Sequence, residues 1–569
     1  MVADLVAELG ANTTAAASKV TAAGQNYREA YLKAFAELDG DIAGRLAAQH
    51  YLKNSTALYH DSVITMGFIP QIYSADELDF FAECAHTTYE ILEAMTERYC
   101  SDASYRKLFG FSPVLEYLIS LPTGYDVAIP ITRIDIFCDL QTHDFMFCEF
   151  NTDGSSAMNE DREICNALSL SETFKRASHA MKLCSQELFD PWVEAFGEIY
   201  AHSSYGEKQA GKGKPTVALV DYQEKTTIKE LEEFQVRFER AGYRCLICDV
   251  AGLSYQDGVL YGIDVGSAQA APQTTQRTAP ATQQTTQRTA PAAQQTPTRI
   301  DAVYRRAVTS DIMIDLAEQE PDEKQTLAKL AQDGDAAGVY ALIAAARDEA
   351  ICLIGGFKTQ VAHSKTAFRM LHHPETLAFL NEEQCCFVQE HVPFTTELSA
   401  ETIAAHQVLE NKQRFIIKPI DGYGTQGVYA GQSYGADEWD QLLNDCSHEG
   451  YVLQEYCPQY AAPNTVPIPL DKDGNPLFAT PEQAAQATAD EQFDPQKLTP
   501  FNLLTGLFVY GGKFAGVYMR AGADALIVGF RGGVTLGTFI ADERGIPEKN
   551  EAGDSEKTNE LSDANKTQI

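Results

Sequence analysis

Positive charge is scarce in this chain of 569 residues. Lysine and arginine together number 44, against 80 aspartates and glutamates, and the formal net charge is -36. Such a balance repels the phosphates of nucleic acids and the anionic surfaces of membranes, so we expect neither as a partner. It would tolerate a cationic substrate, although an ordinary solvated acidic surface explains the charge more simply.

Segments that direct a chain to a membrane are also missing. The opening stretch MVADLVAELGANTTAAASKV lacks a basic region followed by an apolar one, so we predict no signal peptide. No apolar run approaches the roughly 20 residues that a membrane-spanning helix needs. The 13 cysteines are odd in number and irregularly spaced, as is typical of free thiols in a reducing compartment. We therefore expect a cytoplasmic protein.

Cysteines with metal-ligand spacing are limited to one pair, Cys245 and Cys248 in the apolar run YRCLICDV. The alternation of a β strand would point these two thiols to opposite faces. Because no second pair of suitable spacing exists, we expect no zinc or redox site here.

Changes of hydrophobic periodicity divide the chain, and its length favours three or four domains or subdomains. Spacings of three and four at the N-terminus indicate helices, and β-rich runs and a β-α-β order follow. The predicted regions are a helical N-terminal region (1–110), a part with a polar β hairpin (111–205), an α/β subdomain (206–345), a lobe with a glycine-rich loop (346–458), a further β-rich part (459–540) and a tail (541–569).

Low-complexity sequence occupies residues 264–298, where Gln, Thr, Ala and Pro dominate and TTQRTAP occurs twice. Such a tract buries too little apolar area to offset its ordering entropy, so we predict a disordered insertion. A partner-binding segment is the alternative to an inert loop expansion. The strand-like flanks GVLYG and RIDAVYRRAV are expected to be two halves of one domain, and 541–569 is expected to be a disordered tail.

Glycines with G-x-G-x-x-G spacing occur at Gly422, Gly424 and Gly427. A dinucleotide-binding turn would require a helix directly after the third glycine, but the strand-like VYAG follows. Lys418 precedes the glycines on the apparent strand RFIIKP. The order strand, lysine, loop, strand predicts a β hairpin whose glycine tip covers phosphates, with Lys418 as a fixed cation. A plain glycine-rich hairpin is the alternative.

Two further segments suit a nucleotide site. Lys365, in AHSKTAFRML, stands at the start of a helical pattern. The apolar run GYVLQEYCP ends in Gln454, Glu455, Tyr456 and Cys457, and such a crossover from strand to linker can offer backbone groups to an adenine edge. Taken alone, each segment is more often a surface lysine or an ordinary core strand.

The most informative stretch is ITRIDIFCDLQTHDFMFCEFNTDGSS, which starts at Ile131. If its two β runs form an antiparallel hairpin turning near Thr142, Asp135 lies opposite Glu149, and Arg133 lies opposite Asn151. Residues two apart share a face, so the four polar side chains converge. Opposed carboxylates destabilise a sheet unless a cation lies between them.

Two carboxylates and an amide oxygen are hard ligands of the kind that suits Mg²⁺, which also binds water and substrate phosphates. We therefore interpret Asp135, Glu149 and Asn151 as metal ligands. Arg133 beside them would stabilise charge on a transferring phosphoryl group. A solvated hairpin with ordinary charge alternation is the alternative.

In the order of its motifs the chain resembles the glutathionylspermidine synthase family, with R-x-D, E-x-N and two lysines at Arg133-Ile134-Asp135, Glu149-Phe150-Asn151, Lys365 and Lys418. The resemblance covers roughly residues 60 to 540. It implies an α/β (α+β) fold, namely a circularly permuted ATP-grasp with a pre-ATP-grasp-like α/β subdomain. After the asparagine this chain reads Thr-Asp-Gly-Ser-Ser where the family commonly reads Ala-Asp-Thr-Pro-Thr.

The resemblance also implies roles for the candidate residues. ATP and Mg²⁺ would be the cofactors, with the metal on Asp135, Glu149 and Asn151 and with Arg133 acting in catalysis. The residues that would contact the nucleotide are Lys365, Lys418, Gly422, Gly424, Gly427, Gln454, Glu455, Tyr456, Cys457 and Arg520.

The implied activity is that of an ATP-dependent carboxylate-amine ligase that forms an amide bond through an acyl phosphate. Its partners would be a small-molecule or peptide carboxylate and an amine, with polyamines among the candidates. An inactive ATP-binding interaction protein and an ATP-grasp kinase are the alternatives. The acid, the amine and the oligomeric state are not indicated by the sequence.

Overall fold

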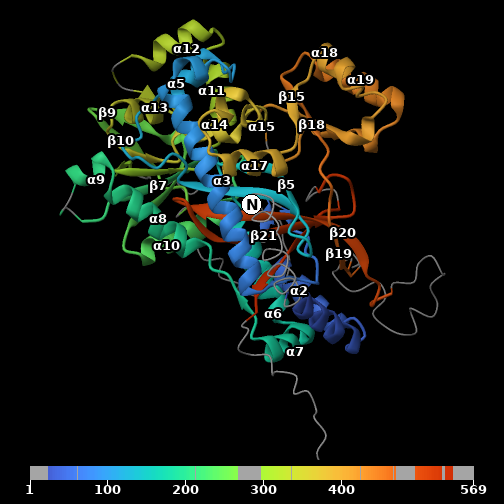
Figure 1. Cartoon of the computed structure of the whole chain (residues 1–569). Coiled ribbons are helices and arrows are strands. Elements are labelled where there is room, and N and C mark those ends of the chain that lie inside the picture. Colours follow the sequence, from blue (N-terminus) through green and yellow to red (C-terminus); the bar gives the residue numbers. More distant parts are fainter. Residues whose placement is uncertain are drawn as a thin grey trace, which may run out of the picture.

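The computed structural model describes residues 24–541, apart from 60–61, 210, 212, 267–295, 333, 335, 423, 466, 469–493 and 528–531. Over these residues the chain is a mixed α/β protein with several separate sheets (Figure 1). Most of the predicted insertion at 264–298 and of the predicted tail at 541–569 lies outside the described residues. Within the described part of the chain, no helix is both long and apolar enough to cross a membrane.

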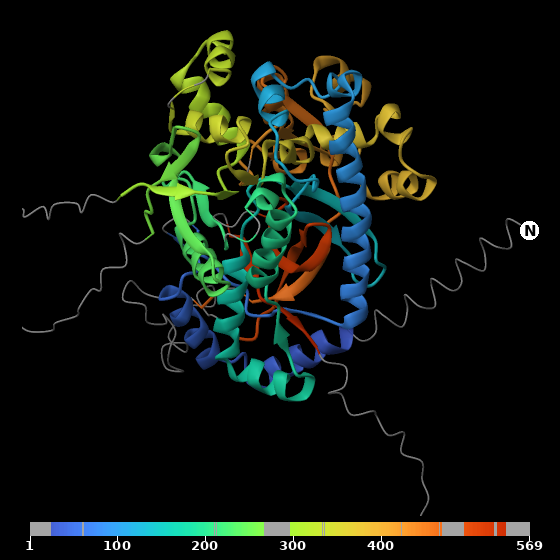
Figure 2. The same ribbon diagram turned by 90° about the vertical axis from the view of Figure 1, so that its left-hand side faces the viewer.

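An antiparallel sheet lies at the centre of the molecule (Figures 1 and 2). It places a hairpin from early in the chain beside two long strands from near its end. Its strands, in spatial order, are β22 (Val534–Leu536), β21 (Lys513–Gly522), β20 (Thr499–Tyr510), β4 (Ile131–Cys138) and β5 (Phe145–Asn151), and β19 (Ala461–Asn464) pairs with β20.

Alternation along β4 separates the core from a cavity on the other face of this sheet. Ile134 and Ile136 pack in a buried cluster with Leu92 of the long helix α3 (Ala75–Ser101), which runs along the sheet in Figure 2. Arg133 and Asp135, one position out of phase, line the cavity. A period of two therefore places Arg133, Asp135 and Phe137 of this strand in the site.

The predicted register of the hairpin is confirmed at its polar end, where Asp135 pairs with Glu149 and Arg133 with Asn151. Towards the turn the prediction is wrong by one residue, because Ile136 pairs with Phe147 and leaves Cys148 as a bulge. A bulge adds one residue to one strand and frees a backbone group from the ladder.

A parallel sheet forms the second unit, with strands in the order β14 (Cys352–Ile354), β12 (Ala302–Arg305), β7 (Thr216–Asp221) and β8 (Arg244–Asp249). Cys245 packs against one of its faces and Cys248 against the other, as the alternation predicts. The helices that cover these faces include α8 (Phe189–Ala201) and α10 (Ile228–Arg240) on one side, and α5 (Pro113–Ile119), α11 (Thr309–Gln319) and α13 (Val339–Arg347) on the other.

The flanks of the insertion form strands, as predicted, and these strands pair with each other. Strand β10 (Val259–Gly262) is antiparallel to β11 (Thr298–Ile300). The same small sheet contains β9 (Ser254–Gln256) and β13 (Ala336–Ala337).

A lobe with its own sheet and core carries the glycine loop. Trp439, on helix α19 (Ala436–Cys446), is fully buried in this core. The sheet has the order β15 (Thr395–Glu397), β18 (Tyr451–Glu455), β16 (Phe415–Pro419) and β17 (Tyr429–Ala430), with all neighbours antiparallel.

The N-terminal part is helical over 24–37 and in α2 (Ile42–Lys53), but it also contributes strands. A short hairpin is formed by β1 (Leu58–Tyr59) and β2 (Ser62–Val63). Strand β3 (Gln71–Tyr73) joins a three-stranded sheet with β23 (Thr538–Ile540) and β6 (Cys184–Ser185), next to α6 (Met158–Ser169) and α7 (Glu172–Met181).

The remaining helices are short and connect these units. They are α4 (Ala103–Arg106), α9 (Ser204–Lys208), α12 (Glu323–Leu330), α14 (Gln360–His363), α15 (Thr366–Leu371), α16 (Pro374–Leu377), α17 (Glu382–His391) and α18 (Ala400–Ala405).

Candidate functional site

A cavity of about 560 Å³ lies where the central sheet, the lobe and the edge of the parallel sheet meet. Of the residues predicted from the sequence, Gly427 alone does not line it. We call the part around Lys365, Lys418 and Gly422 the glycine-loop end. The part around Ser155 and Glu160, which also includes Asp221 and Arg306, is the far end.

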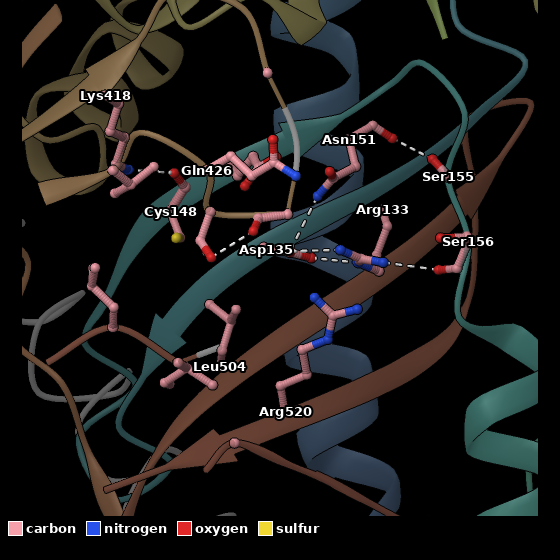
Figure 3. A pocket seen from close by; sticks show the side chains of 18 of the residues that line it. Arg133, Asp135, Cys148, Asn151, Ser155, Ser156, Lys418, Gln426, Leu504 and Arg520 are labelled. Atoms are coloured by element: carbon pink, nitrogen blue, oxygen red, sulfur yellow. Dashed lines mark hydrogen bonds and ion pairs between the residues drawn. The ribbon is translucent and has the colours of Figure 1, made fainter. Parts of the chain in front are cut away.

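Arg133 and Asp135 form a bidentate ion pair in the middle of the cavity (Figure 3). Arg133 donates from Nε to Oδ1 at 2.7 Å and from Nη2 to Oδ2 at 2.9 Å. Asn151 donates from Nδ2 to Oδ2 of Asp135 at 3.1 Å, and Arg133 also donates to the Ser156 carbonyl at 2.8 Å. The four predicted polar residues of the hairpin therefore share one face, with the loop after Asn151 tied to it.

Room for this ion pair depends on Gly506, which faces Asp135 across the β4–β20 ladder. A Cβ atom at this position would lie 2.8 Å from Cδ of Arg133 and 2.9 Å from Oδ1 of Asp135. Sequence reasoning missed this glycine, because its neighbour on β4 lies far away in the chain.

Glu149 faces Asp135 in register, but its side chain makes no hydrogen bond or ion pair with a described residue. Burial opposes ionisation of its carboxyl group. The positive charges of Lys365, His363 and Lys418 outweigh that effect and lower its pKa. A carboxylate kept ionised in this way is available to a cation from the cavity.

Two lysines from different segments converge on the glycine-loop end. Lys365 stands directly before α15 and donates from Nζ to the carbonyl of Gly422 at 3.0 Å. Lys418, on β16, donates to the carbonyl of the bulged Cys148 at 3.2 Å, as Figure 3 shows. Among the described residues neither ammonium has an acidic partner within ion-pair distance. Their charge is therefore available to an anionic ligand.

The glycine loop is the tip of a hairpin, as predicted, since β16 pairs with β17. Gly422 and Gly424 line the cavity, and both have positive φ values of 148° and 65°. Gly427 has a different part: a Cβ atom there would lie 2.7 Å from the Tyr451 hydroxyl. This third glycine permits the turn to pack against β18.

Arg520, on β21, points toward Arg133 in Figure 3 and has no acidic partner at ion-pair distance among the described residues. It donates from Nε to the Tyr518 hydroxyl at 3.0 Å. Both guanidinium carbons lie 5.3 Å from the centre of the Tyr518 ring. Two guanidinium groups that face each other favour an anion between them.

The segment from Gln454 to Cys457 spans the end of β18, as predicted. The N–H groups of Glu455 and Tyr456 already donate to the carbonyls of Phe394, at 2.9 Å, and Arg414, at 2.7 Å. These two N–H groups are therefore not available to a base.

The Gln454 side chain donates to Thr395 Oγ1 at 2.9 Å, so it holds the lobe together. An apolar slot beside this segment was not predicted from the sequence. Its walls come from the β4–β5 hairpin, from the residue at the end of this segment, from β20 and from the loop after β21: Phe137, Cys148, Cys457, Leu504 and Ile527.

The far end is lined by loops that follow strands of the parallel sheet. Asp153 accepts an ion pair from Arg305 and a hydrogen bond from the Thr309 N–H at 2.6 Å. Burial opposes ionisation of Asp153, but Arg305 lowers its pKa. Arg306 lines the cavity and pairs with Glu230 at 3.0 Å.

The N-terminal region also reaches the far end, although its sequence shows no functional motif. Residues 62–65 of the β1–β2 hairpin and the segment after it line the cavity. Only their packing against the rest of the chain reveals this position.

The oxygen donors suit a hard cation. Among the described residues, no three or more His, Cys, Asp and Glu side chains cluster as a metal site. The predicted set has two such groups, Asp135 and Glu149, with the amide of Asn151 as the third. A set of this size fits Mg²⁺, which takes further ligands from phosphates and water.

No protein-family model and no curated protein matches this chain. Among solved structures, it is similar to a glutathione synthetase-like effector from Globodera pallida in its apo form, with 10% identity and a TM-score of 0.49 over 88% of this chain and 97% of that one. It is also similar to a protein named as a gamma-glutamylcysteine synthetase from Methylobacillus flagellatus KT, with 10% identity and a TM-score of 0.33 over 82% of this chain and 89% of that one. Neither likeness is close enough to support a functional assignment.

Proposed function

We propose that this protein is an ATP-dependent carboxylate-amine ligase of the glutathionylspermidine synthase type, with a circularly permuted ATP-grasp site. One observation carries the proposal: Asp135 and Glu149 face each other on a hairpin, and Lys365 and Lys418, which have no acidic partner at ion-pair distance among the described residues, converge on the same cavity. Opposed acids beside free cations suit a metal–phosphate complex.

The nucleotide would bind with its base in the apolar slot and its phosphates at the glycine-loop end. The carbonyls of residues 454–457 would meet polar atoms of the base. Lys365, Lys418 and the backbone of the glycine loop would hold the phosphates. Asp135, Glu149 and Asn151 would hold Mg²⁺, which when bound neutralises phosphate charge and orients the γ-phosphoryl group.

The carboxylate substrate would enter from the far end and attack the γ-phosphoryl group between Arg133 and Arg520. These two guanidinium groups would stabilise the negative charge that develops there. The amine would then attack the acyl phosphate and yield an amide, ADP and phosphate. Positioning and charge neutralisation supply the catalysis, so no covalent protein nucleophile is needed.

A hydroxamate screen tests this function without knowledge of the amine. The protein is incubated with ATP, MgCl₂, hydroxylamine and single acids from a panel of amino acids, dipeptides and tripeptides, and ADP and hydroxamate are measured. We expect at least one acid to give equal amounts of both. A phosphorylated product that hydroxylamine does not cleave would instead indicate a kinase. ATP binding without turnover over the whole panel would indicate a binding module.

A residue-level test uses Glu149→Gln, which keeps the size of the side chain and removes its charge. We expect hydroxamate formation to be lost while the circular dichroism spectrum is unchanged. Glu163→Gln is the matched control: Glu163 is also buried, but it binds Tyr51 and Arg162 outside the cavity. Wild-type activity of Glu149→Gln would contradict the metal assignment.

A further inference from the structure

Glu160 lies in the first turn of α6, close after the loop that follows Asn151. Its side chain lines the far end of the cavity, although only 8% of the residue is exposed. An acidic residue at this helical position commonly serves the helix N-terminus. In this helix another residue has that role. Glu230, on α10, accepts the N–H groups of Ala157 at 2.9 Å and Asn159 at 3.2 Å.

One carboxylate oxygen of Glu160 is fully used and the other is not. Oε2 accepts hydrogen bonds from the Tyr518 hydroxyl and from Thr535 Oγ1, the latter at 3.3 Å. Oε1 makes no hydrogen bond, and Glu160 makes no ion pair, with any residue in the described ranges. This oxygen is not one of the fully buried atoms that lack a partner, so it is open to the cavity. An acceptor that is open on this side can take a hydrogen bond from a donor group of the ligand.

Glu160 is connected through Tyr518 to the two arginines of the cavity. The Tyr518 hydroxyl donates to Glu160 and accepts from Arg520 Nε at 3.0 Å. Arg133 lies over the same tyrosine ring, 5.3 Å from its centre. The Tyr518 hydroxyl therefore connects the Glu160 carboxylate to Arg520. The acyl phosphate would form between Arg520 and Arg133, and Glu160 lies on the far-end side of this position.

We propose that Glu160 binds the attacking amine and acts as its general base, an inference that rests on the ligase function proposed above. The substrate class that fits is a primary or secondary amine that arrives as its ammonium form and donates a hydrogen bond to Oε1. The open oxygen of a carboxylate binds an ammonium group more strongly than it binds a neutral or an anionic nucleophile.

The amine nitrogen loses two protons in this reaction. Glu160 takes one proton from the bound ammonium, and the freed lone pair attacks the acyl carbon. The bond between the acyl carbon and the phosphate oxygen then breaks, and its electron pair leaves with the phosphate. The phosphate carries away the second proton that the nitrogen loses, and Glu160 returns its proton to solvent.

Hydroxylamine separates this role from a structural one, because it is largely unprotonated at neutral pH and needs no base before it attacks. The test compares full-length wild type with Glu160→Gln, using the acid identified by the hydroxamate screen. We expect Glu160→Gln to form hydroxamate within about twofold of the wild-type rate. Its rate of amide formation with an alkylamine should fall by about 10²- to 10⁴-fold, the range for loss of a general base.

Glu163→Gln, on the same helix but outside the cavity, should leave both rates unchanged. If Glu160→Gln does not fold, Glu160→Asp replaces it, since a shorter carboxylate should slow amide formation more than hydroxamate formation. Equal losses in both reactions, or no loss in either, would overturn the role of Glu160 and leave the ligase function intact. Absence of hydroxamate from the wild type with every acid would instead overturn the ligase function.

Discussion

The two ends of the cavity differ in whether their positively charged side chains have acidic partners. At the glycine-loop end, Lys365 and Lys418 donate only to backbone carbonyls and have no acidic partner among the described residues. At the far end, the charge of Arg306 is met by Glu230, and behind it that of Arg305 is met by Asp153.

The paired charges at the far end stabilise the fold, whereas the lysines at the glycine-loop end are available to a ligand. A buried cation without an anion lowers the stability of the fold, so such a group is typical of a site that binds an anion. A buried pair already has its counter-ion, and it fixes two segments of the chain against each other. Mutations at the far end should therefore reduce stability, and mutations at the glycine-loop end should reduce activity.

The largest effect is expected from Arg305→Met, which removes one partner of a buried pair. Asp153 would keep its charge without a cation, and such a loss typically lowers the free energy of unfolding by about 3–5 kcal/mol. Chemical denaturation of the variant and the wild type measures this. Arg299→Met is the control, because its pair with Asp301 is half exposed and should contribute less than about 1 kcal/mol. Equal effects of the two variants would contradict the distinction between the ends.

Lys418→Met should reduce activity rather than stability. We expect ATP-dependent turnover to fall by about 10²- to 10³-fold, the usual loss for a preorganised charge-stabilising group. The free energy of unfolding should change much less than in Arg305→Met, because Lys418 forms no ion pair with a described residue and acts on Glu149 only at longer range. ADP release and thermal unfolding measure the two quantities. Lys412→Met, in the same lobe but bonded to Gly431 and Tyr434 outside the cavity, should leave turnover unchanged.

Gly506→Ala tests how tightly the middle of the cavity is built. The added methyl group would press on Arg133 and Asp135, and overpacking of this kind lowers the free energy of unfolding by about 1–3 kcal/mol. Turnover should fall with it, because the Arg133–Asp135 pair must move. Gly252→Ala is the control, since its Cβ atom would meet no atom within 4 Å. A fully active and stable Gly506→Ala protein would show that the ion pair tolerates displacement.

The smallest effect concerns the pH dependence of stability. The pKa of Glu149 is lowered in the folded protein, chiefly by Lys365 against the opposing effect of burial. Its ionised form therefore stabilises the fold fully above its ordinary pKa of 4.5, and that contribution is lost as the pH falls through the lowered pKa. The difference in unfolding free energy between wild type and Glu149→Gln should shrink below pH 4.5. A difference that grows with acidity would contradict this sign.

Local pattern was sufficient for much of the site. The register of Asp135 with Glu149, the placement of Lys418 on a hairpin strand, and the opposite faces of Cys245 and Cys248 all follow from a period of two and a short turn. The bulge at Cys148 was not predictable, because it is associated with a contact from a distant residue, Lys418, to the backbone carbonyl of Cys148.

By itself, the sequence determined which side chains share a face of each strand, since that depends on neighbours along the chain. Tertiary structure alone decided which faces meet. It placed Gly506 against Asp135, brought residues 62–65 to the far end, and left one oxygen of Glu160 open while Glu230 serves the helix N-terminus. These contacts join segments far apart in sequence, and periodicity contains no information on which partner each face will find.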